Sequence, residues 1–195
     1  MEWKIYHTNT GGKNFKLKFK STKFKNLFII EIEPIEDNRG SFARIWDRKI
    51  FQDNGLNCDF VQSSISYNLK KGTLRGLHYQ IKPYEEAKLV DCIKGKIFDV
   101  VIDLRSDSKT YLQSFQIELN SKDNKILFIP EGFAHGFQTL EDDTEVFYHA
   151  SQFYSPIAEK GIKWNDPIFG INWPYDVTSI SEKDQNLNYF SKIKE

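Results

Sequence analysis

Short alternating segments, separated by turn residues, recur along most of this chain. In residues 97–104 the apolar side chains at positions 98, 100, 102 and 104 fall on one face of an extended strand, and Asp99 and Asp103 fall on the other. Further strands are predicted at residues 27–34, 41–46, 60–67, 73–80, 115–119, 126–129, 137–140 and 145–150. Strands at roughly 8–12-residue spacing predict an all-β fold, either a sandwich or a barrel.

Helix signals are sparse. Asp47 can cap a short helix that runs through Phe51, because its carboxylate can accept from the first free backbone N–H groups. A second helix is predicted near the C-terminus, opened at Ser181 and carrying Phe190 and Ile193. We therefore expect a few short helices, mainly C-terminal.

No internal repeat or linker divides the 195 residues. Residues 1–26 are polar and rich in lysine, and we expect them to form an N-terminal arm with one edge strand. Residues 27–195 are predicted to form the main domain, so that the chain is a single domain overall.

Composition excludes several classes of partner. Lys+Arg and Asp+Glu both number 27, so no net charge attracts nucleic acid or an acidic membrane. No apolar run approaches the roughly 20 residues of a membrane span, and the first residues lack the apolar segment of a secretory signal. The two cysteines, Cys58 and Cys92, are too few for a disulfide framework. These features predict a cytoplasmic protein that binds neither nucleic acid nor membrane.

The segment Gly72-Thr-Leu-Arg-Gly-Leu-His-Tyr-Gln80 carries the first chemical signal. Its two glycines allow a sharp turn or a close backbone approach, so Arg75 and His78 are expected near the mouth of a strand. Imidazole has an unperturbed pKa near neutrality, as a general base requires. Taken alone, this segment is better explained by a core histidine beside a surface arginine.

Two further motifs extend the signal: Pro-Glu-Gly-Phe-Ala-His-Gly-Phe at 130–137 and Lys-Trp-Asn-Asp-Pro at 163–167. Together and in this order, from about residue 27 to about 187, they resemble the dTDP-4-dehydrorhamnose 3,5-epimerases of the cupin class. The resemblance implies a double-stranded β-helix, or jelly roll, that forms a homodimer and needs no metal or organic cofactor. It also implies a nucleotide-linked 4-keto-6-deoxy sugar as substrate, inverted at C5 and usually at C3.

This chemistry needs a base on one face of the sugar, an acid on the other and a positive group at the enolate oxygen. By resemblance, His78 is the base, Asp184 the carboxylate that orients it, Tyr148 the acid and Lys88 the lysine near the ketone oxygen. Ordinary structural roles stay open for three of them. Asp184 could complete a helix cap with Ser181, Tyr148 could be core, and Lys88 could be a solvated surface lysine.

The nucleotide end of the substrate is assigned in the same way. Arg39 and Arg75 match the arginines that face the diphosphate, a role that suits the forked guanidinium donors. Tyr154 matches the ring that stacks on the base. The further substrate contacts implied by the resemblance are Gln62, His135, Glu159 and Lys183.

The chain departs from the dTDP-rhamnose pattern at two places. It has Arg44 where well-known members have a glutamate, and Ser63-Ser64 where they have Asp-Asn. Both belong to the substrate-binding part of the family site. The expected reaction is conversion of dTDP-4-dehydro-6-deoxy-D-glucose to dTDP-4-dehydro-L-rhamnose, for rhamnose or a related deoxysugar of a surface polysaccharide. A GDP- or CDP-linked sugar remains an alternative substrate.

Three other kinds of cupin protein are alternatives to a 3,5-epimerase. A metal-dependent cupin would carry His-x-His where this chain has His78-Tyr79-Gln80, and the loss of one imidazole ligand argues against a metal. A sugar-nucleotide 3,4-ketoisomerase shares the jelly roll, and a non-catalytic sugar-binding cupin would not need Tyr148 opposite His78. Product stereochemistry separates the ketoisomerase, and proton exchange separates the binding protein.

Overall fold

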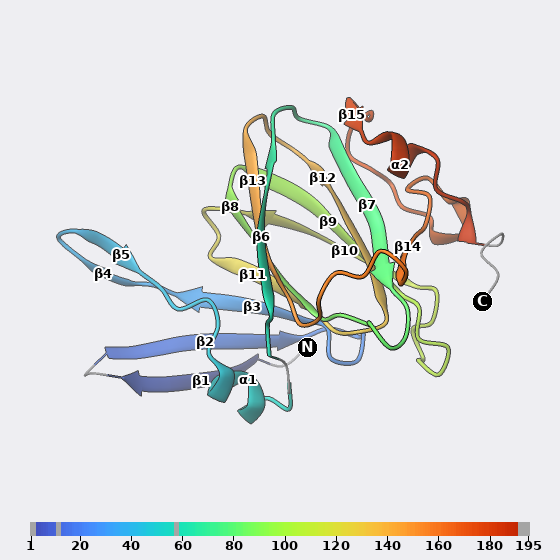
Figure 1. Ribbon diagram of the computed structural model, residues 1–195. Helices are drawn as coiled ribbons and strands as arrows, with labels where there is room; N and C mark the ends of the chain where they lie inside the picture. Colours follow the sequence, from blue (N-terminus) through green and yellow to red (C-terminus); the bar gives the residue numbers. More distant parts are fainter. Residues whose placement is uncertain (1–2, 11–12, 57–58, 191–195) are drawn as a thin grey trace.

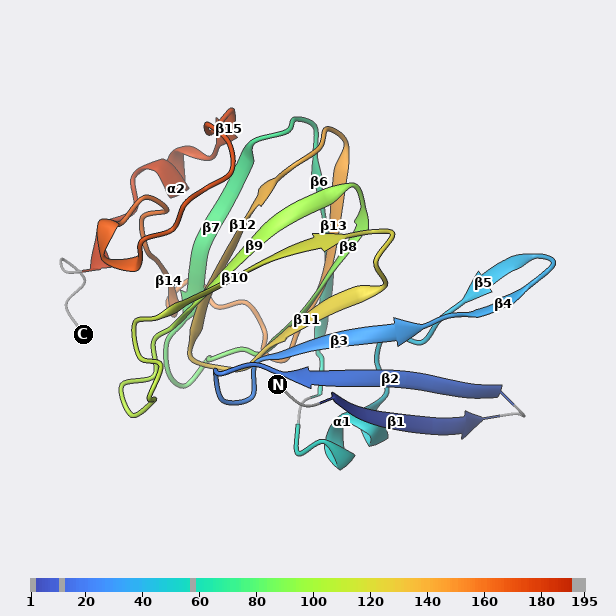
Figure 2. The ribbon, with the colours of Figure 1, turned by 180° about the vertical axis from the view of Figure 1, so that it is seen from behind.

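The computed structural model describes residues 3–10, 13–56 and 59–190. Two large sheets face one another (Figures 1 and 2). The first has seven strands, in the spatial order β1 (Trp3–Thr10), β2 (Lys13–Ser21), β3 (Phe28–Glu33), β11 (Lys125–Ile129), β8 (Lys88–Lys94), β13 (Thr144–Ala150) and β6 (Gln62–Asn68). The second runs β10 (Ser114–Asn120), β9 (Lys96–Asp103), β12 (Phe133–Thr139), β7 (Thr73–Gln80) and β14 (Glu159–Gly161), and β15 (Ser179–Ile180) pairs with β7.

The space between the sheets is filled by an apolar core. Val90, Leu127 and Val146 of the seven-stranded sheet meet Val101 and Phe137 of the other, and all are nearly or fully buried. Apart from the parallel pair β15–β7, the pairings within these sheets are antiparallel. Two facing antiparallel sheets around one core confirm the predicted all-β, jelly-roll fold.

The outer faces of both sheets are also partly covered. Helix α1 (Arg48–Asp53) packs Ile50 and Phe51 on the seven-stranded sheet. The Asp47 carboxylate accepts from Ile50 N–H (3.2 Å), which confirms the predicted cap. On the other side the C-terminal segment, which includes the 3₁₀ turn η1 (Pro167–Phe169), packs against β9 and β12. Strand β9 is therefore buried on both faces.

Three expectations about individual elements were wrong in extent. The strand predicted for 41–46 ends at Phe42, in a separate hairpin of β4 (Ile35–Asp37) and β5 (Gly40–Phe42), because among the described residues no partner strand continues beside it. The N-terminal residues give two strands, β1 and β2, where one was expected.

The C-terminal helix is also shorter than predicted. Helix α2 spans only Glu182–Gln185 and does not reach Phe190, because the chain turns back to pack Leu187 over Gly161. The expectations for Ile193 and Cys58 lie outside the described residues. Within the described ranges, no helix is long and apolar enough to cross a membrane.

Candidate active site

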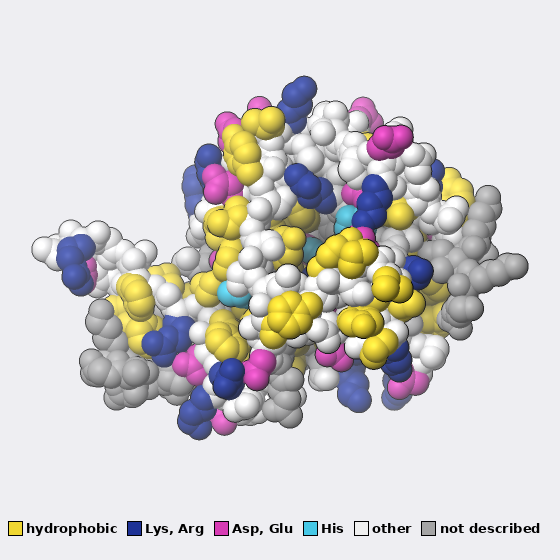
Figure 3. Space-filling view, in the orientation of Figure 1, with side chains coloured by type: hydrophobic (Ala, Val, Ile, Leu, Met, Phe, Trp, Pro, Cys, Tyr) yellow, Lys and Arg dark blue, Asp and Glu magenta, His cyan; other side chains and the backbone are white. Residues whose placement is uncertain are grey.

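A cavity of about 880 Å³ opens between the two sheets. Figure 3 shows its mouth, where histidine, lysine and arginine side chains gather between apolar ones. Strands β7 and β12 form one wall, and β6, β8 and β13 form the other. Of the catalytic and substrate-binding residues predicted from the sequence, all except Arg39 line it: Gln62, Arg75, His78, Lys88, His135, Tyr148, Tyr154, Glu159, Lys183 and Asp184.

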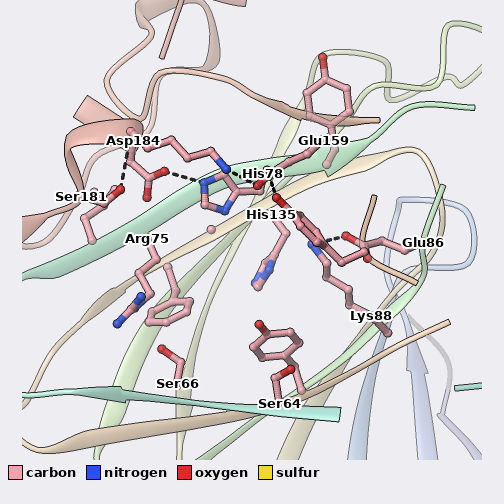
Figure 4. A pocket seen from close by; sticks show the side chains of 18 of the residues that line it. Ser64, Ser66, Arg75, His78, Glu86, Lys88, His135, Glu159, Ser181 and Asp184 are labelled. Carbon is pink, nitrogen blue, oxygen red and sulfur yellow. Dashed lines mark hydrogen bonds and ion pairs between the residues drawn. The ribbon is translucent and has the colours of Figure 1, made fainter. Parts of the chain in front are cut away.

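His78 and Asp184 form a hydrogen-bonded pair across a long stretch of sequence (Figure 4). His78 Nε2–H donates to Asp184 Oδ1 at 2.6 Å, and Gly76 N–H donates to Asp184 Oδ2 at 3.1 Å. The Ser181 hydroxyl caps α2 by accepting from the Asp184 backbone N–H (3.0 Å). The cap predicted from the sequence is therefore present, but the carboxylate of Asp184 serves β7 and leaves Nδ1 of His78 available to take a proton.

The charge of Asp184 is stabilised in this setting. Burial acts to raise its pKa, but the hydrogen bond and charge of His78, with the donors of Gly76 and Ser181, outweigh burial and lower the pKa below its ordinary value. An ionised Asp184 fixes the orientation of the imidazole and stabilises its protonated form. The pair therefore has the parts of a general base.

Tyr148 approaches the cavity from the other sheet. It lies on β13, paired with Ser64 on β6 and with Val90 on β8. Its neighbours in alternation, Val146 and Ala150, are buried, and Tyr148 itself is only partly buried and lines the cavity. The phenol and His78 thus stand on opposing walls of one space.

Lys88 lies on β8 on the same wall as Tyr148. Its ammonium is 3.0 Å from Glu86 Oε1, and both side chains are largely removed from solvent (Figure 4). Gln80 Nε2 donates to Glu86 Oε2 at 3.3 Å. Lys88 is therefore not a solvated surface lysine, since it contributes a positive charge to the cavity wall.

His135 lies beside His78 in the register of β12 and β7. Its Nε2–H donates to Asp99 Oδ2 at 2.8 Å, and Asp99 is fully buried. The alternation in β9 correctly separated Asp99 from the apolar face. That face, however, packs against the C-terminal segment, and Asp99 points between the sheets.

The mouth of the cavity carries a second polar network. Glu159 pairs with Lys183 and accepts from the Tyr154 hydroxyl (2.6 Å). Tyr154 N–H donates to Gln62 Oε1 (2.7 Å). Burial acts to raise the pKa of Glu159, but the bonds from Lys183 and Tyr154 lower it overall, and the bond to Glu159 raises the pKa of Tyr154. The network fixes the loop that carries Tyr154.

Arg75 contributes a positive charge to the cavity wall. Its Nε donates to Asn68 Oδ1 (2.7 Å) and its Nη2 to the Tyr67 carbonyl (3.4 Å). In the part of the chain that the structure describes, no carboxylate is paired with its guanidinium. An arginine held only by neutral acceptors can still bind a diphosphate through its remaining donors.

Arg39 is placed differently from the other predicted residues. It lies at the turn of the β4–β5 hairpin, which projects away from the body of the molecule (Figure 1), and it pairs with Asp37. The structure therefore does not bring Arg39 to the cavity of its own chain.

The residues that depart from the family pattern lie in different places relative to the cavity. Arg44 lies outside the cavity, 3.1 Å from Asp47 and over the ring of Phe15. Ser63 points away and bonds to His149 Nδ1 (2.8 Å), whereas Ser64 lines the cavity. Only Ser64 could touch a ligand in this chain's own cavity.

Sequence reasoning missed two carboxylates and the use of one amide. Glu86 stands two residues before Lys88, and residues two apart on an extended chain share a face, so this pairing had a local signal. Asp99 had no such signal in the sequence, because nothing there shows that both faces of β9 are buried. Gln80 was considered only as a missing metal ligand. Among the described residues, no group of three His, Cys, Asp or Glu side chains could hold a metal ion.

Comparison with known proteins agrees with this geometry. The family model described as dTDP-4-dehydrorhamnose 3,5-epimerase matches residues 21–192. A protein of that name from Methanothermobacter thermautotrophicus is 42% identical over 88% of this chain and 93% of its own length.

Solved structures are similar as well. The Bacillus anthracis dTDP-4-dehydrorhamnose 3,5-epimerase, with TDP and pyrophosphate bound, has a TM-score of 0.86 at 36% identity over 89% of this chain and 99% of that one. A Legionella pneumophila 3,5-epimerase in complex with dTDP-4-keto-L-rhamnose has a TM-score of 0.86 at 33% identity over 91% and 95%. This chain belongs to the dTDP-4-dehydrorhamnose 3,5-epimerase family.

Proposed function

We propose that the protein inverts C3 and C5 of dTDP-4-dehydro-6-deoxy-D-glucose and produces dTDP-4-dehydro-L-rhamnose. One observation carries the proposal. His78 of β7, paired with Asp184 of α2, faces Tyr148 of β13 across the same cavity, and Lys88 of β8 lies on the same wall as Tyr148. The Legionella relative, crystallised with dTDP-4-keto-L-rhamnose, supports the choice of sugar.

The proposed reaction passes through an enolate. The C4 ketone acidifies the hydrogens on C3 and C5, and His78 Nδ1 removes one of them while Asp184 stabilises the resulting imidazolium. The ammonium of Lys88 stabilises the negative charge that develops on the C4 oxygen. Tyr148 then gives its proton to the opposite face of the carbon, which inverts it. His78 passes the proton it took to solvent and Tyr148 regains one from solvent, and the second centre is then inverted in the same way.

The nucleotide is proposed to lie along the mouth. Arg75 faces the diphosphate, Tyr154 stacks on the base, and Lys183, Glu159 and Gln62 hold that loop in place. His135, fixed by Asp99, contacts the sugar beside His78. Arg44 pairs with Asp47 outside the cavity, so its difference from the family's glutamate does not act on a nucleotide bound in this chain's own cavity.

We also propose that the protein is a cytoplasmic homodimer. The edge strand β6 exposes Ile65 and Tyr67, with exposed fractions of 62% and 49%, and β8, on the other side of β13, exposes Ile93. A second copy that covered these apolar side chains would remove them from water. The buried thiol of Cys92 is suited to a reducing compartment.

The test of the activity is incubation with dTDP-4-keto-6-deoxyglucose in heavy water, followed by NMR of C3 and C5. Deuterium at both carbons, with the L-rhamno product, is expected. Exchange at neither carbon would refute the proposal, and a 3-keto product would indicate a ketoisomerase.

Turnover is expected to survive exhaustive chelation. A metal cupin would need a ligand in place of Gln80, but its amide is used by loop contacts, with Oε1 accepting from Ser155 N–H (2.6 Å). Activity should therefore be unchanged after dialysis against a chelator. Activity that is lost and then restored by zinc, iron or manganese would contradict this expectation.

A further inference from the structure

Glu86 is a second carboxylate inside the cavity, and it has no part in the mechanism above. It precedes Lys88, the first residue of β8, by two positions, and the side chains of Glu86 and Lys88 are 14% and 12% exposed. At this exposure a carboxylate and an ammonium lose much of their hydration, so each depends on the other as a partner. Their 3.0 Å contact is therefore a fixed feature of the wall, unlike an exposed ion pair.

The other oxygen of Glu86 is held from behind by Gln80. This amide is 5% exposed and sits between two loops. Its Nε2 donates to Glu86 Oε2 (3.3 Å) and to the carbonyls of Tyr84 (3.0 Å) and Phe153 (3.3 Å), and its Oε1 accepts from Ser155 N–H. A chain of contacts thus runs from the loop beside Tyr154 through Gln80 and Glu86 to Lys88.

We propose that Glu86 is a positioning residue for the reaction, holding the ammonium of Lys88 where the C4 oxygen of the substrate must lie. The inference rests on the proposed function for the role of Lys88. A lysine side chain has four flexible carbons, so a free ammonium would sample many positions. A preorganised donor stabilises developing charge without reorganising during the reaction.

The benefit must come from geometry, because the charge of Glu86 acts in the wrong direction. A carboxylate beside the developing enolate repels it, so removing only the charge costs little. Removing the hydrogen-bond acceptor releases the ammonium. Glu86→Gln keeps an oxygen acceptor, whereas Glu86→Leu keeps the approximate volume and removes every polar atom.

The two variants are compared with wild type for kcat and KM in deuterium exchange at C3 and C5. Glu86→Leu is expected to lower kcat by roughly 10- to 100-fold, the effect of a small displacement of a catalytic group, with KM changed less than about twofold. Glu86→Gln is expected to lose no more than about threefold. The matched control is Glu85→Leu, at the adjacent residue that does not line the cavity, and it should behave as wild type.

A double-mutant cycle with Lys88→Met separates positioning from a structural role. If Glu86 acts through Lys88, Glu86→Leu costs nothing further once the ammonium is gone. An additive loss in the double variant, an effect on KM alone, or equal losses in the Gln and Leu variants would overturn the proposal.

Crystal structures of the variants without substrate give a readout independent of the reaction. The ammonium of Lys88 should keep its place in Glu86→Gln and leave it in Glu86→Leu, while Gln80 keeps its loop contacts. An unmoved ammonium in Glu86→Leu would overturn the positioning role even in an active enzyme. If wild type shows no exchange, the proposed function fails, and this structural comparison still decides whether Glu86 positions Lys88.

Discussion

At the scale of single residues, the proposed reaction depends on one imidazole, that of His78. His78→Asn is expected to abolish deuterium incorporation at both C3 and C5, a loss of at least about 10³-fold, because one base on one face serves both carbons. Asp184→Asn should be milder, since the imidazole remains but loses the charge that orients it. Exchange is followed by NMR.

A matched histidine serves as the control for this prediction. His149 lies on β13 but bonds to Ser63 and does not line the cavity, so His149→Asn should keep normal exchange. Binding of dTDP, measured by calorimetry, should be retained in all three variants. Wild-type exchange in His78→Asn would show that the base lies elsewhere.

The motifs in the sequence marked His78 and Asp184 as candidates, but they could not show that the two side chains contact one another. His78 and Asp184 lie 106 residues apart, and the local pattern around Asp184 favoured a helix cap, which the structure also contains. What decided its role was a contact between the C-terminal segment and β7. Such a contact has no periodicity to reveal it. Glu86 was visible beside Lys88, but nothing marked that pair as buried.

At the scale of elements, the close approach of the paired strands β7 and β12 depends on two glycines, Gly76 and Gly136. A Cβ on Gly76 would lie 2.7 Å from Gly136 Cα and 2.8 Å from the His135 carbonyl oxygen, and Gly76 has a φ of +114°. Gly76→Ala is expected to destabilise the fold by about 2–5 kcal/mol, from backbone strain and the clash together. It should also slow exchange, because Gly76 N–H holds Asp184.

Gly55→Ala separates the two causes of this destabilisation, backbone strain and steric clash. Gly55 also has a positive φ, of +76°, but a Cβ there meets nothing within 4 Å. It should therefore cost only the strain, about 1–2 kcal/mol, and leave exchange intact. Denaturant midpoints of the two variants measure the difference, and equal shifts would argue against a close approach of the strands.

The loop that joins β9 to β10 is organised by Asp103, which is fully buried. Burial acts to raise its pKa, but the hydrogen bonds of Arg105, Ser108 and Thr110 outweigh burial and lower the pKa to about 2. A depressed folded pKa stabilises the protein above the ordinary pKa of 3.8, and this stabilisation is lost as pH falls through about 2. The ionised form contributes about 2 kcal/mol at neutral pH.

Asp103→Asn should therefore destabilise the protein at pH 6 and lose most of that effect as the pH approaches 2. Denaturant unfolding of wild type and variant at several pH values gives the comparison. A destabilisation that stays constant from pH 6 to pH 2.5 would show that the carboxylate charge is not its cause.

The sequence predicted the presence of individual elements better than it predicted what packs against them. The alternation in 97–104 correctly indicated a strand, and Asp47 correctly indicated the start of α1. The same alternation could not show what covers each face, because β9 meets the interior on one side and the C-terminal segment on the other. The strand expected through residue 46 failed for a related reason: within the described ranges β5 pairs with β4 alone, and this pairing ends at Phe42.

At the scale of the whole molecule, Arg39 is the predicted site residue that does not line the cavity of its own chain. The other predicted residues line the cavity of their own chain, but the β4–β5 hairpin carries Arg39 away from it (Figure 2). If Arg39 faces the diphosphate, as the resemblance implies, it must do so in the cavity of a second copy. The homodimer would then be part of the active site.

Mixing two inactive variants tests this arrangement. Arg39→Ala lacks the donated arginine and His78→Asn lacks the base, so each homodimer should be impaired. In a mixed dimer one site combines an intact His78 with an intact Arg39 from the other chain, and the second site lacks both. Random exchange makes half of the dimers mixed, so about a quarter of wild-type activity should return. If Arg39 served its own cavity, every site in the mixture would lack one residue, and activity would stay at the level of the separate variants.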